Sequence, residues 1–466
     1  MKSAKLDCSL IPKDTIIQEK VADYMETIQL LLSQHIGAPC KPVVKAGDTV
    51  KKGTLVATPT GLGANIFSSI YGTVSEVLDD RIVITPDEKQ PDTYIPIDEA
   101  DKLTMIKEAG IVGMGGAGFP AAVKMKVDLE GGYVLINAAE CEPGLKHNIT
   151  RIEDCPEKII AGVKHVMEIT NAGKAIFAIK KKNEKAVDVL RKAIANEDAM
   201  TIHLLPDIYP MGEERAVVRE CLGIELDTTQ LPSAAHAVVS NVETLYRIAE
   251  AIDDRKPCFS KDVTVIGRLN GGPAPHVYLD VPVGTSVKSL IERAGGIEGD
   301  YGEIIMGGPF TGRSTTLDAP ITKTTGGIIV TIPFPDLHGA TVGLLICACG
   351  GSEERMHEIA KKMNGKVVSQ VRCKQAIENK PGAPLKCERP GNCPGQIHNT
   401  MQFKKDKCEY IIIGNCSDCS NTVMASAPRL KLKVFHQTDH VMRTINHPLY
   451  RHLTISKEVD QLPNGK

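Results

Sequence analysis

The chain has 466 residues, of which 42% are hydrophobic and 24% are charged, as is typical of a folded globular protein rather than a disordered or fibrous one. Its 55 lysines and arginines nearly balance 57 aspartates and glutamates, which excludes nucleic-acid binding driven by bulk charge. The length predicts about three domains of roughly 150 residues. No apolar run reaches the ~20 residues of a membrane-spanning helix, and Met1–Pro12 hold no signal-peptide core, so we expect a cytoplasmic protein that at most lies peripherally on a membrane.

The N-terminal region is predicted to be a helical segment, residues 1–34, followed by a small barrel, residues 35–100. Apolar residues recur at helical spacing over residues 15–34. Short apolar runs then alternate with Gly, Pro and Asp, and the segment VKAGDTVKKG at Val44–Gly53 is similar to the hairpins of lipoyl-like barrels. Residues 54–78, where a carrier barrel would hold its modified lysine, contain no lysine. We therefore expect the barrel scaffold without the carrier function.

Residues 101–258 are predicted to form an α/β domain. Apolar runs of strand length alternate with stretches of helix length, which is typical of a mainly parallel sheet with ligand sites at the strand ends. The predicted strands are 134–137, 175–179 and 202–205, and the predicted helices begin near Asp154 and cover 183–195, 212–222 and 241–252. Residues 259–338 return to short strands with a helix at 289–294, which predicts a small β-grasp domain. Residues 339–466 are predicted to be a cysteine-rich redox domain.

A glycine-rich segment, GMGGAGFP at Gly113–Pro120, fits the pattern G-x-G-x-x-G. The preceding residues, 101–109, have a helical pattern, so the segment does not predict an ordinary dinucleotide-binding turn, which needs a preceding strand. Its glycines still let backbone amides approach a phosphate or a flat ring closely, and Lys124 can supply a positive charge. We therefore expect a ligand-binding loop, with a plain flexible turn as the alternative.

Three further segments place polar residues where α/β domains bind ligands. NAAECEPG (Asn137–Gly144) follows a predicted strand, YPMGEE (Tyr209–Glu214) opens one predicted helix, and NVETL (Asn241–Leu245) opens another. With the glycine-rich loop, and in this order, these segments resemble the flavin-mononucleotide domain of the 51-kDa subunit of respiratory complex I and the C subunit of the Rnf electron-transport complex. The barrel, the β-grasp segment and TKTTGGI at Thr322–Ile328 resemble the Rnf C subunit more closely and imply an SLBB-like β-grasp domain.

The resemblance implies FMN as a non-covalent cofactor and NADH as its hydride donor. It implies that the glycine-rich loop and Lys124 cradle the flavin phosphate, that Asn137 hydrogen-bonds the flavin, and that Glu142 lies near the nicotinamide or flavin edge. Asn241 and Thr244 would close on the ribityl phosphate. The implied loop glycines are Gly113, Gly115, Gly116 and Gly118, and the implied dinucleotide-pocket residues are Tyr209, Gly212, Glu213 and Glu214.

Cysteines are concentrated near the end of the chain. Eight of the 14 are Cys347, Cys349, Cys373, Cys387, Cys393, Cys408, Cys416 and Cys419. In a reducing compartment such a dense group indicates metal binding or redox chemistry rather than structural disulfides. The two ferredoxin-type runs of the Rnf C subunit, C-x-x-C-x-x-C-x-x-x-C-P, are absent here. The usual electron exit of that family is therefore not expected in this chain.

Three interpretations of these cysteines stay open. Four thiolates could hold an iron–sulfur cluster, or two close pairs could hold structural zinc. The pairs Cys347/Cys349 and Cys416/Cys419 could instead be redox-active dithiols, with Cys416 placed between the predicted strand 410–413 and a helix. The candidate catalytic thiols are Cys347, Cys349, Cys416 and Cys419, and the candidate metal ligands are these four with Cys387 and Cys393.

An Rnf C-like chain without ferredoxin runs resembles the electron-transfer protein associated with D-proline reductase. This resemblance implies an NADH-dependent electron-transfer flavoprotein that passes electrons through its C-terminal cysteines to a partner reductase such as D-proline reductase. The alternatives are a peripheral subunit of a membrane-bound Rnf-type ferredoxin:NAD oxidoreductase and a non-catalytic scaffold that has lost the flavin. We expect an oligomer or a subunit of a complex, without nucleic-acid partners.

Overall fold

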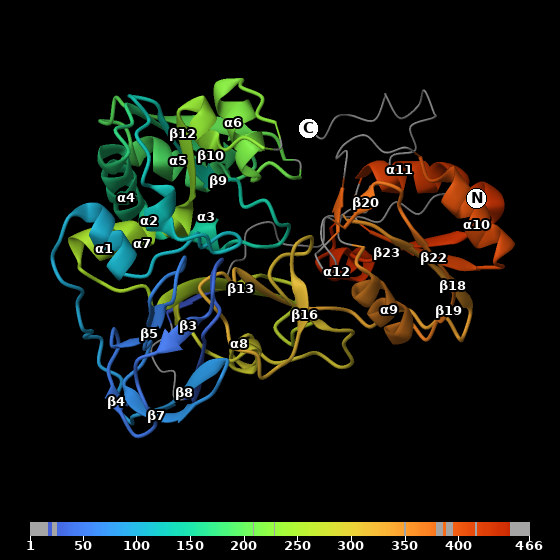
Figure 1. The fold of residues 1–466 in the computed structure, drawn as a ribbon, viewed down its shortest axis with the longest axis horizontal. Helices are drawn as coiled ribbons and strands as arrows, with labels where there is room; N and C mark the ends of the chain where they lie inside the picture. The colour runs from blue at the N-terminus through green and yellow to red at the C-terminus, as the bar shows by residue number, and fades with distance from the viewer. Residues whose placement is uncertain are drawn as a thin grey trace. The chain divides into compact units, whose positions relative to one another are not determined.

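The computed structural model describes residues 17–20, 26–207, 209–227, 229–348, 351–378, 385–387, 395–414 and 417–447. The chain divides into two compact units. Unit 1 comprises Met1–Gly296, Met306–Gly308 and Ser314–Ile328, and unit 2 comprises Ile297–Ile305, Pro309–Arg313 and Ile329–Lys466. Figure 1 shows the elements of each unit along the chain.

Unit 1 begins with a barrel of two small antiparallel sheets, ordered β2-β8-β7-β4 and β3-β5-β6. The strands are β2 (Ile28–Leu31), β3 (Cys40–Pro42), β4 (Thr49–Val50), β5 (Leu55–Pro59), β6 (Ile66–Phe67), β7 (Gly72–Val77) and β8 (Arg81–Pro86). Their alternate residues form one apolar core that includes Ile28, Leu30, Val56 and Ile84. The positive φ of Gly47 and Gly53 supports the turns on both sides of β4 within the segment that predicted this barrel.

The predicted helix within residues 1–34 is wrong. The described part of this segment holds β1 (Ile17–Lys20) and β2, and β2 pairs with β8 in antiparallel register. Ile28 and Leu30 are fully buried, whereas their neighbours Gln29 and Leu31 are only partly buried. A short apolar run fits both a helical and an alternating pattern, and the pairing with β8 decides between them.

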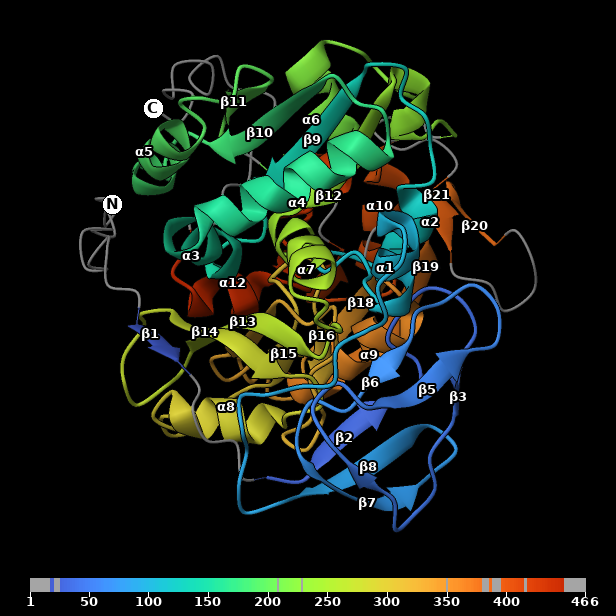
Figure 2. The same cartoon turned by 90° about the vertical axis from the view of Figure 1, so that its left-hand side faces the viewer.

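The α/β part of unit 1 is a parallel four-stranded sheet of order β11-β10-β9-β12 between two layers of helices. Its strands are β9 (Tyr133–Ala138), β10 (Lys174–Lys180), β11 (Met200–Leu205) and β12 (Ala237–Asn241). Its helices are α1 (Lys102–Glu108), α2 (Ala121–Lys124), α3 (His147–Asp154), α4 (Pro156–Ile169), α5 (Glu184–Ala193), α6 (Glu214–Leu222), the 3-10 helix η2 (Pro232–Ala235) and α7 (Val242–Asp253). Figure 2 shows α4 and α7 side by side on one face of the sheet, and α6 packs on the other.

The helix starts follow side-chain capping. The Asn241 side chain accepts from two backbone N–H groups at the start of α7, and Glu213 does the same for α6. The helix predicted to begin near Asp154 is α4 (Pro156–Ile169), but Asp154 itself is the last residue of α3 and not the N-cap. Cys155 separates α3 from α4, where Pro156 occupies the first turn without needing a backbone N–H.

A third main sheet is mixed and has the order β1-β14-β13-β17-β15-β16. Its later elements are β13 (Ser260–Gly267), β14 (His276–Pro282), β15 (Ile304–Met306), β16 (Arg313–Thr315) and β17 (Gly327–Val330), with α8 (Val287–Arg293) after β14. β13 pairs antiparallel to β14, and Ser286 caps α8. The SLBB-like assignment of residues 259–338 and the predicted domain boundaries stay predictions.

Unit 2 contains a second parallel sheet, of order β19-β18-β22-β23. Its elements are β18 (Thr341–Ile346), α9 (Glu353–Lys362), β19 (Lys366–Arg372), β20 (Ala376–Ile377), β21 (Lys386–Cys387), α10 (Ile397–Lys405), β22 (Tyr410–Ile413), α11 (Ser417–Ser426), the 3-10 helix η3 (Pro428–Leu430), β23 (Lys433–His436) and α12 (Asp439–Thr444). One face of the sheet packs on α9 and the other on α10 and α11. Within the described ranges, none of the helices is both long and apolar enough to cross a membrane.

Candidate functional site

The candidate site lies where the strand order of the unit 1 sheet reverses. β10 and β11 follow β9 on one side, whereas β12 lies on its other side. At this boundary Asn137, near the end of β9, is directly opposite Asn241, the last residue of β12. Open α/β sheets bind ligands beyond the carboxyl ends of the strands at such a reversal. The register thus places two of the predicted site residues side by side.

Asn137 joins two of the predicted segments. Its Nδ2 donates to the carbonyl oxygen of Gly212 at 2.8 Å, and its Oδ1 accepts from the backbone N of Ala139 at 3.2 Å. A Cβ on Gly212 would lie 3.0 Å from the Cβ of Cys141 and 3.3 Å from the Asn137 amide nitrogen. Glycine at 212 therefore lets the YPMGEE turn approach β9 closely. Burial raises the pKa of the Cys141 thiol in this contact.

The glycine-rich loop is fixed to the start of α7. A Cβ on Gly115 would lie 2.5 Å from Asn241 Nδ2, and the backbone N of Met114 donates to Thr244 Oγ1 at 2.9 Å. A Cβ on Gly116, by contrast, would meet nothing within 4 Å. Bare loop backbone thus adjoins the N-terminus of a 12-residue helix, where an anion is favoured. The loop lies between α1 and α2, which confirms that it is not an ordinary strand-to-helix dinucleotide turn.

The two ends of the loop rest on the segment that contains Lys323 and Thr324. Lys323 is only 1% exposed, and its Nζ donates to the carbonyl oxygens of Asn65 at 2.6 Å and Gly110 at 2.7 Å. Burial lowers the pKa of this ammonium group. At the other end, a Cβ on Gly118 would lie 3.0 Å from Thr324 Cγ2. The TKTTGGI segment therefore contacts the chain at both ends of the loop, and Lys323 also connects it to the barrel through Asn65.

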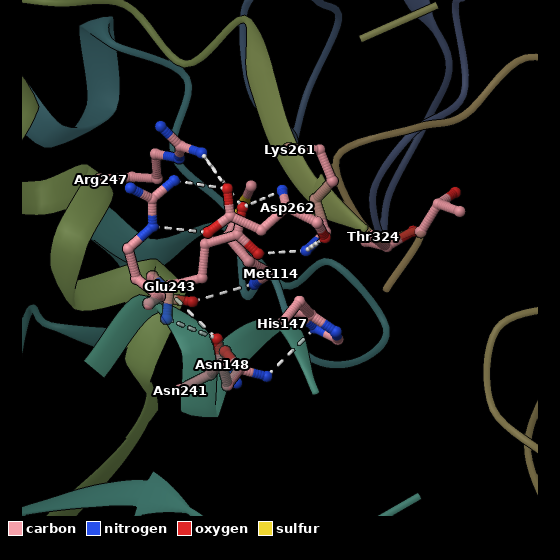
Figure 3. A network of polar contacts seen from close by, with 12 residues as sticks. Met114, His147, Asn148, Asn241, Glu243, Arg247, Lys261, Asp262 and Thr324 are labelled. Carbon is pink, nitrogen blue, oxygen red and sulfur yellow. Dashed lines mark hydrogen bonds and ion pairs between the residues drawn. The ribbon is translucent and has the colours of Figure 1, made fainter. Parts of the chain in front are cut away.

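A buried network of charges holds α7 in place, and Figure 3 shows its side chains pointing toward one another. Glu243 accepts from the backbone N of Asp262 at 2.8 Å and pairs with Lys261. Arg247, one turn further along α7, contacts Asp262 at 3.1 Å, and Arg151 of α3 binds both Asp262 oxygens at 2.6 and 2.7 Å. Burial opposes ionisation of Asp262, but the two guanidinium groups outweigh it and keep its pKa below the usual range.

Three predicted pocket residues have partners within the protein. The Lys124 ammonium of α2 pairs with the Glu214 carboxylate at the start of α6. The Glu213 carboxylate accepts from the backbone N of Arg215 and of Ala216, both at 3.1 Å, and so caps α6. The sequence predicted that Lys124 contacts a phosphate. In this structure its ammonium group is paired with the Glu214 carboxylate.

Tyr209 and Glu142 lie near each other beside this turn. The Tyr209–Pro210 peptide bond is cis, and Tyr209 is 43% exposed. Partial burial, followed by the charges of Glu142 and Cys141, raises the Tyr209 pKa. Glu142 also packs against the backbone of Gly308, where a Cβ would lie 2.3 Å from its Cγ. The structure thus places Tyr209 and Glu142 on the same side of the turn that Asn137 holds.

The C-terminal cysteines are only partly described. Cys347 follows the last residue of β18, and Cys387 lies on β21. Cys349, Cys393 and Cys416 fall outside the described residues, and Cys419 lies on α11 with its side chain outside the description. Within the described part of the chain, no group of three or more His, Cys, Asp or Glu residues could hold a metal ion. The cluster, zinc and dithiol interpretations therefore stay predictions.

Sequence reasoning missed several residues that build the site. Glu140 has a φ of +38° and accepts from the backbone N of Asn148 at 2.8 Å, which shapes the chain after β9. Glu140, Glu243 and Lys323 all lie inside segments quoted for their pattern, so a signal was present. No sequence signal marked Asp262, because its partners Arg151 and Arg247 lie on other elements and a single aspartate in an apolar strand does not indicate them.

The arrangement fits the phosphate end of FMN. The loop offers exposed glycine backbone, the space beside Gly116 is open, and the helix N-terminus behind it favours negative charge. A side chain at 115 would meet the capping amide of Asn241, so the cradle depends on glycine there. These observations agree with a cofactor that carries a phosphate group.

Two family models match the chain, the RnfC barrel sandwich hybrid domain at residues 13–100 and the Nuo51 FMN-binding domain at residues 106–250. The C subunit of the proton-translocating ferredoxin:NAD(+) oxidoreductase complex of Clostridium ljungdahlii is 33% identical over 66% of this chain and 72% of its own length. The C subunit of the Na(+)-translocating complex of Acetobacterium woodii is 32% identical over 65% of this chain and 73% of its own length. The chain belongs to the RnfC family.

For this RnfC-family chain, the matches confirm the predicted barrel and the predicted complex I-type domain, and FMN is the cofactor of that domain. The cobalamin reductase PduS of Salmonella typhimurium is also similar, with 38% identity over 48% of each chain. The chain therefore spans about half the length of that relative. The family and these relatives support an oxidoreductase that functions in electron transfer.

Proposed function

We propose that this RnfC-family chain takes hydride from NADH at FMN and passes the electrons to a protein acceptor. The observation that carries the proposal is the register that places Asn137 opposite Asn241, with the glycine-rich loop fixed to the same helix start. When bound, FMN accepts a hydride from a nicotinamide and releases electrons to an acceptor. The chain's own residues position the cofactor and shield it.

In this proposal, the backbone of Gly113, Gly115, Gly116 and Gly118 binds the FMN phosphate at the start of α7. Asn241 and Thr244 act by fixing that helix start and the loop to each other. Asn137 positions the YPMGEE turn through its hydrogen bond to Gly212. Tyr209, Gly212, Glu213 and Glu214 line the dinucleotide pocket, and Glu142 lies near the nicotinamide or flavin edge. Lys124 reaches the phosphate region while its pairing with Glu214 holds it near the pocket.

The proposal also covers the route by which electrons leave the flavin. The C-terminal cysteines would carry electrons as dithiols or as ligands of a cluster, in place of the ferredoxin runs that the chain lacks. The acceptor would be a reductase, and D-proline reductase is the candidate that the sequence resemblance suggests. The chain would work in the cytoplasm as an oligomer or as part of a larger complex.

The second candidate is a peripheral subunit of a membrane-bound Rnf-type complex. The favouring observation is that the relatives covered over about 70% of their length are C subunits of ferredoxin:NAD(+) oxidoreductase complexes. In that case the acceptor or donor would be ferredoxin rather than a soluble reductase. Purification of the chain from cell membranes together with integral subunits would favour this candidate.

The deciding experiment is the visible absorbance spectrum of anaerobically purified protein, before and after NADH. We expect flavin bands that bleach with NADH. The variant Asn241→Ala should weaken FMN binding by about tenfold, because it removes about 1–1.5 kcal/mol of capping and loop support. Asn183→Ala is the matched control, since Asn183 precedes α5 and makes no capping bond. A protein that stays colourless after incubation with FMN would contradict the proposal and leave only a scaffold role.

A further inference from the structure

Unit 2 carries a basic patch, although the net charge of the whole chain is only −2. The patch surrounds a solvent-exposed cavity of about 370 Å³ at the amino edge of the unit 2 sheet, beside the starts of β22 and β23. Lysines from two separate stretches of the chain meet there, and all of them are exposed. The lysines of this basic patch are Lys404, Lys407, Lys431 and Lys433.

Negative groups do not neutralise the basic patch. Among the described residues that line the cavity, Glu409 is the single carboxylate, and it accepts from the backbone N of Thr341 at 3.4 Å. Cys408 also lines the cavity, and burial raises its pKa to about 11, so its thiol stays neutral at pH 7. Just outside the cavity, Asp406 is offset by exposed Lys405. The cavity therefore keeps a clear excess of positive charge, which attracts an anionic partner.

The backbone holds two of these lysines in an unusual conformation. Lys407, just after α10, and Lys431, just after η3, both have a φ of +57°. Glycine and asparagine adopt such angles more easily than lysine does, so backbone conformation alone does not favour lysine at either position. Lys433 is held differently, because its Nζ donates to the Tyr410 hydroxyl at 3.0 Å. These positions place charge at the cavity, and stability of the turns does not require it.

An exposed apolar stripe on α10 adjoins the basic patch. Ile397 is 64% exposed and Met401 is 50% exposed, although both are large and apolar. The two residues lie four positions apart and Lys404 follows three positions later, so all three share one face of α10. Figure 1 shows α10 beside α11 in unit 2. Protein interfaces combine an apolar centre with a charged rim in this way.

The other end of the stripe lies next to a C-terminal cysteine. Gln396, directly before α10, donates from its Nε2 to Cys373 Sγ at 3.5 Å, and Cys373 is half-buried. The nine residues of α10 span about 13 Å. A protein partner that buries about 800 Å² could therefore cover the cysteine end, the stripe and the basic patch together. A small anion could occupy only the cavity and would leave Ile397 and Met401 exposed.

We infer that the exposed face of α10 and the basic patch form the docking surface for an acidic electron-transfer protein. The lysines steer and orient the partner by charge complementarity, and Ile397 and Met401 supply its apolar contacts. Docking in this orientation brings the partner to the Cys373 end of α10. The role of the partner as an electron acceptor rests on the proposed function, whereas the charge and shape of the surface do not depend on it.

The test measures the binding of a purified ferredoxin of net negative charge to the full chain, by fluorescence anisotropy and without FMN. We expect the wild type to bind at about 20 mM salt and to lose about tenfold in affinity at about 200 mM, where exposed charges are screened. Met401→Gln should weaken binding about fivefold at both salt concentrations, because it removes an apolar contact and no charge.

A pair of double variants separates the basic patch from overall charge. Lys407→Gly with Lys431→Gly should weaken binding about tenfold at low salt, while Tm stays equal or rises, because glycine suits both backbone positions. Lys361→Gln with Lys192→Gln is the matched control, since it removes two exposed lysines from α9 and α5. The control should bind ferredoxin like the wild type.

No binding by the wild type, or an equal loss in both double variants, would overturn the inference. The same proteins are mixed with phosphatidylserine vesicles and, without any partner, sedimented to measure self-association. If Lys407 and Lys431 control vesicle binding or self-association but not ferredoxin binding, the surface belongs to a lipid or to a second copy, and the inference fails.

A second stage separates this inference from the proposed function. NADH is added to the FMN-loaded chain in the presence of the ferredoxin. If ferredoxin binding depends on the basic patch and NADH does not bleach the flavin, the docking surface stands and the proposed function fails. If NADH bleaches the flavin and ferredoxin binding ignores the basic patch, the proposed function stands and the docking surface fails.

Discussion

At the residue scale, Asn241 ties the loop to the helix with the two ends of one amide. Its Oδ1 caps α7 through the backbone N of Glu243 at 2.9 Å, and its Nδ2 occupies the space where a side chain at 115 would be. The glycine at 115 is therefore required by packing, whereas the neighbouring Gly116 faces open space. Two glycines of the same motif thus differ in their role: packing requires the first, whereas the second leaves its side of the loop open.

We expect Gly115→Ala to lower the free energy of unfolding by about 1–2 kcal/mol, because the new methyl displaces the capping amide of Asn241. Gly116→Ala, with nothing within 4 Å, should stay within about 0.5 kcal/mol of the wild type. Urea unfolding of both variants without FMN measures the difference. Equal stabilities for the two variants would mean that the loop does not rest on Asn241.

Lys323 gives a second prediction at this scale. Replacement by Met keeps the length of the side chain and removes the donors to Asn65 and Gly110, at about 1 kcal/mol for each hydrogen bond. The loop should loosen at its base, so we expect the dissociation constant of FMN to rise about tenfold. Flavin fluorescence quenching measures it, and exposed Lys288→Met is the control. Unchanged affinity in Lys323→Met would show that the loop keeps its shape without this support.

At the scale of elements, the buried charges connect α7 and α3 with two strands. The cations are Arg151, Arg247, Lys256 and Lys261, and the carboxylates are Glu243, Glu250, Asp262 and Asp280. Within this network the four charges of each sign balance, and Asp280 is its one partly exposed carboxylate. Because Glu243 lies two residues after Asn241, the network also sets the position of the helix start at the candidate site.

Asp262→Ala should therefore destabilise unit 1 by about 3–5 kcal/mol, since it leaves two buried guanidinium groups without a shared partner. The exposed pair Asp188–Arg191 at 3.1 Å is the matched control, and Asp188→Ala should cost less than about 1 kcal/mol. Denaturant midpoints of the two variants compare the effects. A small effect of Asp262→Ala would mean that water enters the network and screens it.

At the scale of the whole molecule, each unit contains its own apolar core, and buried carboxylates occur in both units. In unit 2, Glu303 is 4% exposed and accepts from Arg355, from Lys362 at 2.7 Å and from His440 Nε2 at 2.6 Å. Burial opposes its ionisation, but these hydrogen bonds and charges outweigh burial and hold the Glu303 pKa well below its usual range. Burial lowers the pKa of His440, so the neutral ring is favoured beside it.

Both shifts predict that unit 2 loses stability in acid. The unfolded chain binds a proton at Glu303 near pH 4 and at His440 near about pH 6.5, above the folded values, so stability falls as pH decreases through these ranges. Hydrogen-exchange mass spectrometry of β18 at pH 7 and pH 4 measures this loss. In Glu303→Gln the acid dependence should be smaller, and exposed Glu354→Gln is the control. An unchanged pH slope in Glu303→Gln would contradict this assignment.

Much of the architecture was predictable because local patterns agree with the fold. The strands of the α/β domain are continuous apolar runs between helices, a pattern that indicates a buried parallel sheet. The segment at residues 15–34 misled because its apolar residues fit two periods, and the partner strand β8 that decides between them lies some fifty residues away. The helix start near Asp154 was predicted correctly, but the N-cap is Cys155, because Asp154 ends the preceding helix α3.

The sequence by itself determined the barrel, the sheet, the order of the ligand segments and the family they resemble, since these depend on local period, turn chemistry and motif. Only the tertiary structure decided that Asn137 lies opposite Asn241, that Lys323 supports the loop, and that Arg151 and Arg247 share Asp262. Register and the partners of buried charges are contacts between residues far apart in the chain. Their energies depend on burial and distance, which no local pattern encodes.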